Sequence, residues 1–182
     1  HLYFQYMIIQ FCGLSGSGKS TLANAAKARL ESVMEIEVID GDVYRKTLCA
    51  DLGFSRADRE INIRRLAKLA SEFAAEGKIP IICAINPYDS IRREITGQYP
   101  DVHTIFIQCG LEELFRRDTK GLYRKTQHPP EHPERVNNLS GVNDPFEAPA
   151  DAALVINTDR ESIEESAAKL VAFILLNVGA KV

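Results

Sequence analysis

Residues 13–20 read GLSGSGKS and match the pattern G-x-x-x-x-G-K-[ST] at every fixed position. An apolar run at residues 8–12 precedes this stretch and a helical pattern follows it, which is the context that a phosphate-binding loop requires. The glycines let successive backbone N–H groups wrap a phosphate, and the following helix adds its positive N-terminal end. We therefore predict a nucleoside triphosphate site.

Two side chains of this loop have specific chemistry. Lys19 is expected to place its charge on the β- and γ-phosphates, and Ser20 to offer a hydroxyl ligand to Mg²⁺. The N-K-x-D and D-x-x-G motifs of GTPases are missing from their expected places, so a small-molecule kinase fits better. The expected ATP-binding residues of the loop are Gly13, Ser15, Gly16, Ser17, Gly18, Lys19, Ser20 and Thr21.

Short apolar runs alternate with helical patterns along the rest of the chain. The predicted strands are residues 8–12, 36–39, 79–85, 103–108 and 153–157. The predicted helices are residues 19–31, 43–51, 56–76, 89–97, 111–117 and 160–178. Such alternation indicates a doubly wound parallel sheet. We expect the α/β class: a three-layer α/β/α P-loop kinase fold with about five strands and helices on both faces.

Composition limits the possible partners and location. The chain has 182 residues, a formal net charge of −3 and 45% hydrophobic residues, which suits one domain of ordinary globular type. A broad basic surface is therefore absent and no apolar run is long enough to span a bilayer, so we expect neither a nucleic-acid nor a membrane partner. The four cysteines show no C-x-x-C spacing, which favours a reduced, cytoplasmic protein.

Two segments fall outside this pattern. Residues 1–6 resemble the end of a purification tag with a protease site, although a genuine N-terminal strand is an alternative, so residues 7–182 are expected to form the kinase domain. Residues 127–149 contain five of the chain's eight prolines. A loop of that length in a compact domain is typically a functional lid, and we place the lid at residues 116–149.

A second group of polar residues follows the second predicted strand. Asp40, Gly41 and Asp42 come first and Arg45 follows. Carboxylates at the end of a strand beside the phosphate loop can hold Mg²⁺-bound water or accept a proton from an attacking hydroxyl. The simpler alternative is an Asx turn that caps the next helix.

Residues 52–65, LGFSRADREINIRR, are rich in arginine where a helix is expected to start. Arg59 and Asn62 are three positions apart and therefore share one helix face. A guanidinium group and an amide can bind phosphate or sulfate oxygens. A solvated charged helix face is the alternative.

Together these residues resemble the adenylylsulfate (APS) kinases of sulfate assimilation. The similarity runs through GLSGSGKST, DGDVYR, DLGFSRADREINIRR, NPY, RDTKGLYRK and GVNDPFEAP, and so covers nearly the whole chain from Met7. It implies an enzyme that uses MgATP to phosphorylate the 3′-hydroxyl of APS, giving PAPS and ADP. It also allows a homodimer, because members of the family are commonly dimers.

The resemblance implies a role for each matching residue. Lys19, Asp40 and Asp42 would be catalytic, Ser20 and Asp40 would lie at Mg²⁺, and Arg116 and Thr158 would contact ATP. Asp42 would orient or deprotonate the 3′-hydroxyl, and Phe54 would stack on the APS adenine. The implied substrate-binding residues are Asp40, Asp42, Arg45, Phe54, Arg59, Asn62, Ile85, Asn86, Lys120 and Leu139.

Several positions depart from the family pattern. Asn86 replaces a serine that is sometimes described as a phosphorylated intermediate, and Asp89 replaces a basic residue. Leu139 replaces a phenylalanine expected on the second adenine face, and Gln108 replaces an aspartate. The prolines around His128 and His132 prevent a helical pair of ligands, so we expect no zinc site there. A kinase for a different modified nucleotide, or a non-catalytic nucleotide-binding module, therefore remains an alternative.

Overall fold

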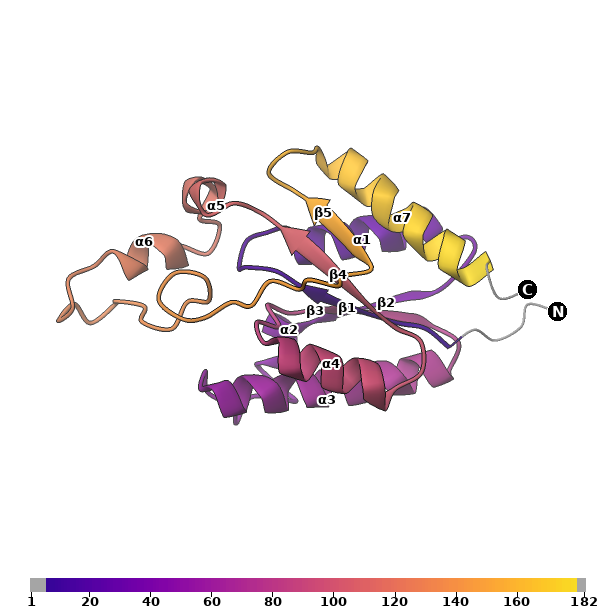
Figure 1. Ribbon diagram of the computed structural model, residues 1–182, viewed down its shortest axis with the longest axis horizontal. Coiled ribbons are helices and arrows are strands. Elements are labelled where there is room, and N and C mark those ends of the chain that lie inside the picture. Colours follow the sequence, from indigo (N-terminus) through magenta and orange to yellow (C-terminus); the bar gives the residue numbers. More distant parts are fainter. Residues whose placement is uncertain (1–5, 180–182) are drawn as a thin grey trace.

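The computed structural model describes residues 6–179, and Figure 1 shows it as a central sheet between helices. The strands are β1 (Ile8–Cys12), β2 (Ile36–Asp40), β3 (Ile79–Cys83), β4 (Val102–Gln108) and β5 (Leu154–Asn157). The helices are α1 (Lys19–Leu30), α2 (Gly41–Tyr44), α3 (Arg56–Ala75), α4 (Asp89–Gln98), α5 (Leu111–Arg117), α6 (Leu122–Thr126) and α7 (Ile163–Gly179). All paired strands are parallel, in the order β2-β3-β1-β4-β5. The predicted α/β fold with five strands is confirmed.

The two faces of the sheet have separate cores. Ile9 and Phe11 of β1 point to the face covered by α1 and α7, whereas Ile8 points to the face covered by α3 and α4. Side chains of a strand alternate between faces, and all five residues of β1 are buried. Burial on both faces explains why the central strands are continuous apolar runs.

The late part of the chain packs against β4 beside α4. In Figure 1, α5 and α6 project beyond the carboxyl ends of the strands, and the chain then returns along the sheet to β5. Phe146 stacks on Phe106 of β4 with 5.8 Å between ring centroids. The backbone N–H of Glu147 donates to the carbonyl of Pro87. These contacts fix the return path against the start of α4.

Several predicted boundaries are wrong. The helix expected at 43–51 is only the four-residue α2, because the following backbone forms turns and Arg45 folds back to donate to the carbonyl of Gly53. The strand expected at 79–85 ends at Cys83. The last helix begins at Ile163, where Ser162 and Glu165 cap each other's backbone N–H groups, as in a capping box. The sequence did not predict α6, whose first turn is held by the Asp118 carboxylate.

The sequence analysis also concerned membrane-spanning segments and the cysteines. Within residues 6–179, no helix is both long and apolar enough to cross a bilayer. All four cysteines are unpaired and buried. Residues 1–5 of the suggested tag lie outside the described part of the chain.

Candidate active site

The phosphate loop connects β1 to α1 and depends on its glycines. Gly16 and Gly18 have φ angles of 77° and 104°, in the left-handed region that glycine adopts without strain. At Gly13, a Cβ atom would lie 2.4 Å from the carbonyl oxygen of Ile107. The Thr158 hydroxyl donates to the Ser17 carbonyl at 2.6 Å and so ties β5 to the loop. The loop is thus held in shape by its own backbone and by a neighbouring strand.

Lys19 lies inside the curve of this loop. Its Nζ donates to the carbonyl oxygens of Gly13 at 2.9 Å and Leu14 at 2.8 Å. Burial, together with the smaller effect of the nearby Lys120 charge, lowers the pKa of Lys19 to about 8. The ammonium group is thus held where phosphates would bind, and its bonds to neutral carbonyls can be exchanged for stronger charged ones.

Asp40 stands at the carboxyl end of β2 and has two partners. Its Oδ1 accepts from the backbone N–H of Asp42 at 3.0 Å and caps α2, and its Oδ2 accepts from the Ser20 hydroxyl at 3.0 Å. The Asx cap considered from the sequence is therefore present, and the same carboxylate also faces the phosphate loop. A hydroxyl and a carboxylate are oxygen donors that suit Mg²⁺.

One pocket of about 640 Å³ joins the phosphate loop to the second group of polar residues. It contains sixteen of the twenty residues predicted from the sequence. They are Ser15, Gly16, Gly18, Lys19, Ser20, Thr21, Asp40, Asp42, Arg45, Phe54, Arg59, Asn62, Ile85, Asn86, Lys120 and Leu139. The strand order explains this meeting, because the carboxyl ends of parallel strands open into one crevice.

Arg59 is the most constrained cation of the pocket. It lies on the first turns of α3 with its side chain 7% exposed and forms an ion pair with Asp144 at 3.0 Å. It also donates to the Ser140 hydroxyl at 2.9 Å and to the carbonyls of Asn138 and Phe54. All three nitrogens of the guanidinium therefore contact the chain itself, and three of the four contacts are with the late loop (residues 127–149).

Other cations of the pocket are also paired within the chain. Arg45 donates to the Gly53 carbonyl at 2.7 Å and lies over the Phe54 ring, 4.7 Å from its centroid. Lys120 forms an ion pair with Asp42 across the pocket. Phe54 is 56% exposed, although the guanidinium of Arg59 also lies 5.7 Å from the centroid of its ring.

Four predicted ATP contacts lie outside the lining of the pocket. The backbone N–H groups of Gly13 and Ser17 donate to the carbonyls of Ile85 and Leu14 and so fix the shape of the phosphate loop. Thr158 donates to the Ser17 carbonyl, as described above. Arg116 is exposed and binds Glu113, whose carboxylate has a pKa lowered to about 2 by hydrogen bonds from Arg116 and Arg117. Its contact with ATP stays a prediction.

The departures from the family pattern have specific surroundings. Leu139 is 4% exposed and packs in a cluster with Cys109, Leu114 and Tyr123 while also lining the pocket. Asp89 does not line the pocket; it pairs with Arg93 at 2.6 Å, which lowers the pKa of Asp89. The expected reversal of charge near the pocket is therefore compensated locally.

The two histidines of the proline-rich insert lie together. Glu134 lies close to His128 and His132, so the fold brings three residues of metal-binding type together without a helix. However, the imidazole rings stack with 4.0 Å between centroids and only 10° between planes. Nitrogen lone pairs lie in the ring planes, so those of nearly parallel stacked rings do not converge on one ion.

Sequence reasoning missed several residues that shape the pocket. Asn138 and Ser140 hold Arg59, and the Tyr123 hydroxyl donates to the Ser15 carbonyl at 2.6 Å. Gln10 is fully buried in β1 and bonds to Asn86. A single amide within the apolar run MIIQFC was a signal that could have singled out Gln10.

The fold and the pocket define the class of protein. A phosphate loop between β1 and α1, a carboxylate after β2 and a late segment beyond the sheet are the features of a P-loop kinase. The family model for adenylylsulphate kinase matches residues 5–157. The chain belongs to the adenylylsulphate kinase family.

Comparison with individual proteins agrees with this assignment. The chain is 38% identical to an adenylyl-sulfate kinase of Picosynechococcus over 89% of both chains. It is 41% identical over 91% of its length to a probable bifunctional SAT/APS kinase 2 of Sorangium cellulosum, of which it spans 28%. It superimposes with a TM-score of 0.85 and 34% identity on the Mycobacterium tuberculosis APS kinase solved with AMPPNP and APS, covering 93% of this chain and 97% of that one.

Proposed function

We propose that this protein transfers the γ-phosphoryl group of ATP to the 3′-hydroxyl of APS and releases PAPS and ADP. The observation that carries the proposal is the single pocket in which the phosphate loop faces Arg59, Asn62 and the exposed Phe54 ring. The loop suits a triphosphate, the cation and amide suit a phosphosulfate, and the ring suits a purine.

Positioning and charge neutralisation account for most of the catalysis in phosphoryl transfer. Lys19 exchanges its bonds to loop carbonyls for the β- and γ-phosphate oxygens. Ser20 and Asp40 are the oxygen donors that would hold Mg²⁺, whose role when bound is to neutralise phosphate charge. The start of α1 and the end of β2 hold these three side chains in one place before substrate arrives.

The transfer itself involves one bond formed and one bond broken. The 3′-oxygen of the acceptor attacks the γ-phosphorus, and the bond from that phosphorus to the β–γ bridging oxygen breaks. Asp42 orients the 3′-hydroxyl and receives its proton. Lys120, which pairs with Asp42 in the structure, moves to the substrate's phosphate oxygens and leaves the carboxylate free.

Direct in-line transfer needs no phosphorylated side chain. The family's serine is Asn86 in this chain, and an amide cannot form such an intermediate. The acceptor is held instead by Arg45, Arg59 and Asn62, with Phe54 on one face of the adenine and Leu139 near the other.

A same-fold kinase for a different modified nucleotide is the second candidate. Asn86 and Leu139 favour it, because both line the pocket and both depart from the family pattern. Purified protein with MgATP should be tested against APS and against other 5′-modified adenine nucleotides, with ADP release as the readout. Turnover of APS supports our proposal, turnover with another nucleotide alone supports the second candidate, and binding without turnover would indicate a non-catalytic module.

The remaining expectations are proposals of the same kind. Residues 7–182 form one kinase domain, residues 116–149 act as its lid, and the small-molecule partners are ATP and APS. A homodimer and a cytoplasmic location stay predictions from the sequence. Light scattering of the purified protein tests the first of these two.

A further inference from the structure

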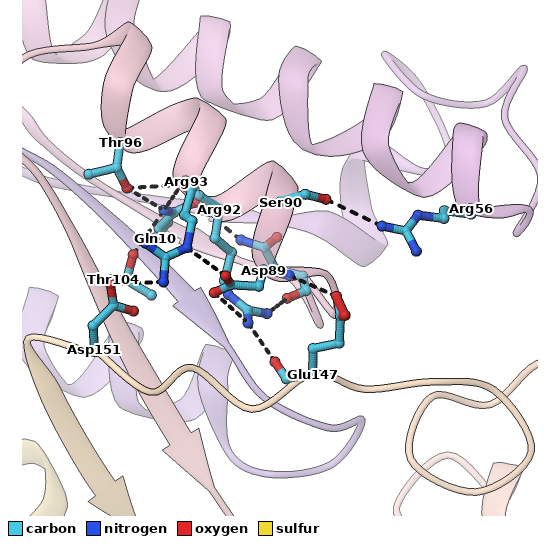
Figure 2. Close-up of polar contacts among 11 residues, drawn as sticks. Gln10, Arg56, Asp89, Ser90, Arg92, Arg93, Thr96, Thr104, Glu147 and Asp151 are labelled. Carbon is cyan, nitrogen blue, oxygen red and sulfur yellow. Dashed lines mark hydrogen bonds and ion pairs between the residues drawn. The ribbon is translucent and has the colours of Figure 1, made fainter.

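The late loop is fixed to the rest of the chain at Glu147, where it turns back towards β5. The Glu147 carboxylate accepts a hydrogen bond from the Asp89 N–H at 3.0 Å, and the Glu147 N–H donates to the Pro87 carbonyl at 2.8 Å. The Glu147 carbonyl accepts from the Arg92 guanidinium. Figure 2 shows Glu147 beside Asp89 and Arg92 at the start of α4. We call these contacts of Glu147 with Pro87, Asp89 and Arg92 the Glu147 anchor.

Arg92 is the central residue of the Glu147 anchor. It is 2% exposed, and its Nη1 donates to the Asn86 carbonyl at 2.7 Å while its Nη2 donates to Glu147. The Arg92 carbonyl accepts from the amide of Gln10 at 3.1 Å, and the Asp89 carboxylate lies 3.5 Å from the guanidinium. A buried charge is costly unless it is paired and hydrogen-bonded. These contacts therefore hold Arg92 in one position.

The anchor joins two walls of the pocket on its acceptor side. One wall is the segment after β3, residues 84–87, and the other is the late loop, which contributes Val136 and Leu139. Arg92 binds one backbone carbonyl of each segment. Neither Arg92 nor Glu147 lines the pocket itself. The anchor thus lies behind both walls, and their relative position depends on it.

The late loop is also attached at the pocket, but by a contact of a different kind. Asp144 pairs with Arg59, the cation that the acceptor is proposed to bind. Three positions later, Glu147 is bound to groups outside the lining of the pocket. Substrate can replace the first contact but does not reach the second. Movement of the late loop on acceptor binding should therefore end between Asp144 and Glu147.

We propose that Arg92 and Glu147 are positioning residues for the acceptor, because they hold the fixed end of the late loop and set its position relative to the segment after β3. The inference rests on the proposed function, since it takes APS as the acceptor. It goes beyond that function by assigning a role to two residues outside the pocket. Phosphoryl transfer depends on how the reactants are positioned, so loosening the anchor should weaken APS binding and lower kcat.

The test compares four variants for kcat, for the KM for ATP and for the dissociation constant of APS in the presence of MgADP. Arg92→Met removes the donor to both wall segments, and Glu147→Ala removes the carboxylate bound to the Asp89 N–H. Glu147→Gln keeps an oxygen that can accept the same hydrogen bond. Arg93→Met is the matched control, because it removes a neighbouring charge of α4 that pairs with Asp89 and Asp151 instead.

The expected losses fall on the acceptor. Arg92→Met should weaken APS by about five- to tenfold and Glu147→Ala by about two- to fivefold, since the first loses buried hydrogen bonds and the second an exposed one. Glu147→Gln and Arg93→Met should stay within about twofold of wild type. The double variant of Arg92→Met and Glu147→Ala should bind APS about as weakly as Arg92→Met alone, because both changes break the same anchor.

A merely structural role gives a different pattern. The Ile85 carbonyl in the segment after β3 accepts from the Gly13 N–H, so general loosening would raise the KM for ATP as well. Equal weakening of ATP and APS would overturn the proposal, as would an effect of Arg93→Met or Glu147→Gln as large as that of Glu147→Ala. Glu147 is exposed, so Glu147→Ala keeps the test decisive if Arg92→Met does not fold.

Hydrogen exchange of the Glu147 N–H, followed by NMR, tests the anchor without a measurement of activity. Binding of APS and MgADP should change exchange in residues 138–144 and leave the Glu147 N–H protected, whereas Arg92→Met should speed its exchange with no ligand present. Faster exchange at Glu147 on APS binding would overturn the proposal. If the wild type neither binds nor turns over APS, the proposed function fails. Unchanged Glu147 exchange in free Arg92→Met would separately show that the anchor does not hold the loop.

Discussion

The two halves of the pocket differ in how their charged groups are prepared for substrate. On the phosphate-loop side, the shape depends on glycine conformations and backbone bonds, and Lys19 donates to neutral oxygens of the loop. On the acceptor side, Arg59 is bound to a carboxylate, a hydroxyl and two carbonyls, and Lys120 is bound to Asp42.

This difference indicates two kinds of binding. ATP phosphates enter a loop whose shape already exists, so little has to be broken. APS must compete with the chain's own oxygen atoms for the acceptor-side cations. The late loop is the part that gives way, because Asn138, Ser140 and Asp144 all belong to it. Acceptor binding and movement of the late loop should therefore be coupled.

The largest effect is expected on the preformed side. Lys19→Ala should lower kcat by about 10²–10³-fold or more, because the lost charge stabilises the transferring phosphoryl group. The fold should survive, since the hydrogen bonds of Lys19 are all with the phosphate loop itself. Steady-state kinetics and thermal unfolding measure both quantities. Near-normal turnover by a folded Lys19→Ala protein would contradict the kinase assignment itself.

Arg59→Ala should have the next largest effect, and on the acceptor alone. Loss of a charge-assisted contact corresponds to about 1.5–3 kcal/mol, so the KM for APS should rise by about 10- to 100-fold while ATP binding changes little. The melting temperature should also fall, because Asn138, Ser140 and Asp144 lose their partner. Equal weakening of ATP and APS would mean that Arg59 supports the whole pocket rather than the acceptor site.

The pKa of Lys19 predicts a pH dependence limited to the free enzyme. Its pKa is lowered to about 8, and only the protonated form attracts phosphates, so kcat/KM for ATP should be constant below pH 8 and fall about tenfold per pH unit above it. Bound phosphates favour the charged form of Lys19, so kcat should not fall near pH 8. Lys19→Arg is the matched control, and kcat/KM for its residual activity should not fall above pH 8. If kcat/KM for ATP of Lys19→Arg fell above pH 8 as in the wild type, the titrating group would be another residue.

Leu139→Phe should give a smaller effect. A ring at this position would stack on the adenine face opposite Phe54 and tighten APS by about 1 kcal/mol, or fivefold. Leu139 packs against Leu114 and Tyr123, so the larger side chain should also lower the free energy of unfolding by about 1–3 kcal/mol. Titration of APS with MgADP and chemical denaturation measure the two effects. Weaker APS binding would mean that Leu139 only packs against Leu114 and Tyr123 and does not lie next to the adenine.

The fold could be predicted from the sequence because its signals are local. The run of residues 8–12, the loop GLSGSGKS and the isoleucine-rich strands each specify their own structure, and parallel order follows from their alternation with helices. The extent of α2 could not be predicted in this way, since it depends on Arg45 bending back to Gly53. The start of α7 could have been predicted from the capping pair Ser162 and Glu165. Hydrophobic periodicity alone does not reveal such a pair.

The sequence predicted which residues line the pocket but not which other residues they bind. Sequence motifs identified sixteen residues that line the pocket, because the carboxyl ends of parallel strands bring such motifs together. They gave no indication that Arg59 binds the late loop about 80 positions further along the chain. They also gave no indication of the buried chain from Arg92 through Gln10 to Asn86. Such contacts depend on tertiary packing, which no local pattern encodes.

The comparison between the two halves is tested most directly by Asp144→Asn, with APS affinity measured in the presence of MgADP. Asp144 competes with the substrate for Arg59 at 3.0 Å, and removing its charge while keeping its size should release the guanidinium. If APS competes with Asp144 for Arg59, APS should bind more tightly to this variant. The expected gain is about two- to fivefold, because a partly exposed ion pair contributes about 0.5–1 kcal/mol. Weaker binding of APS would contradict it, because Asp144 would then be holding Arg59 ready for the substrate.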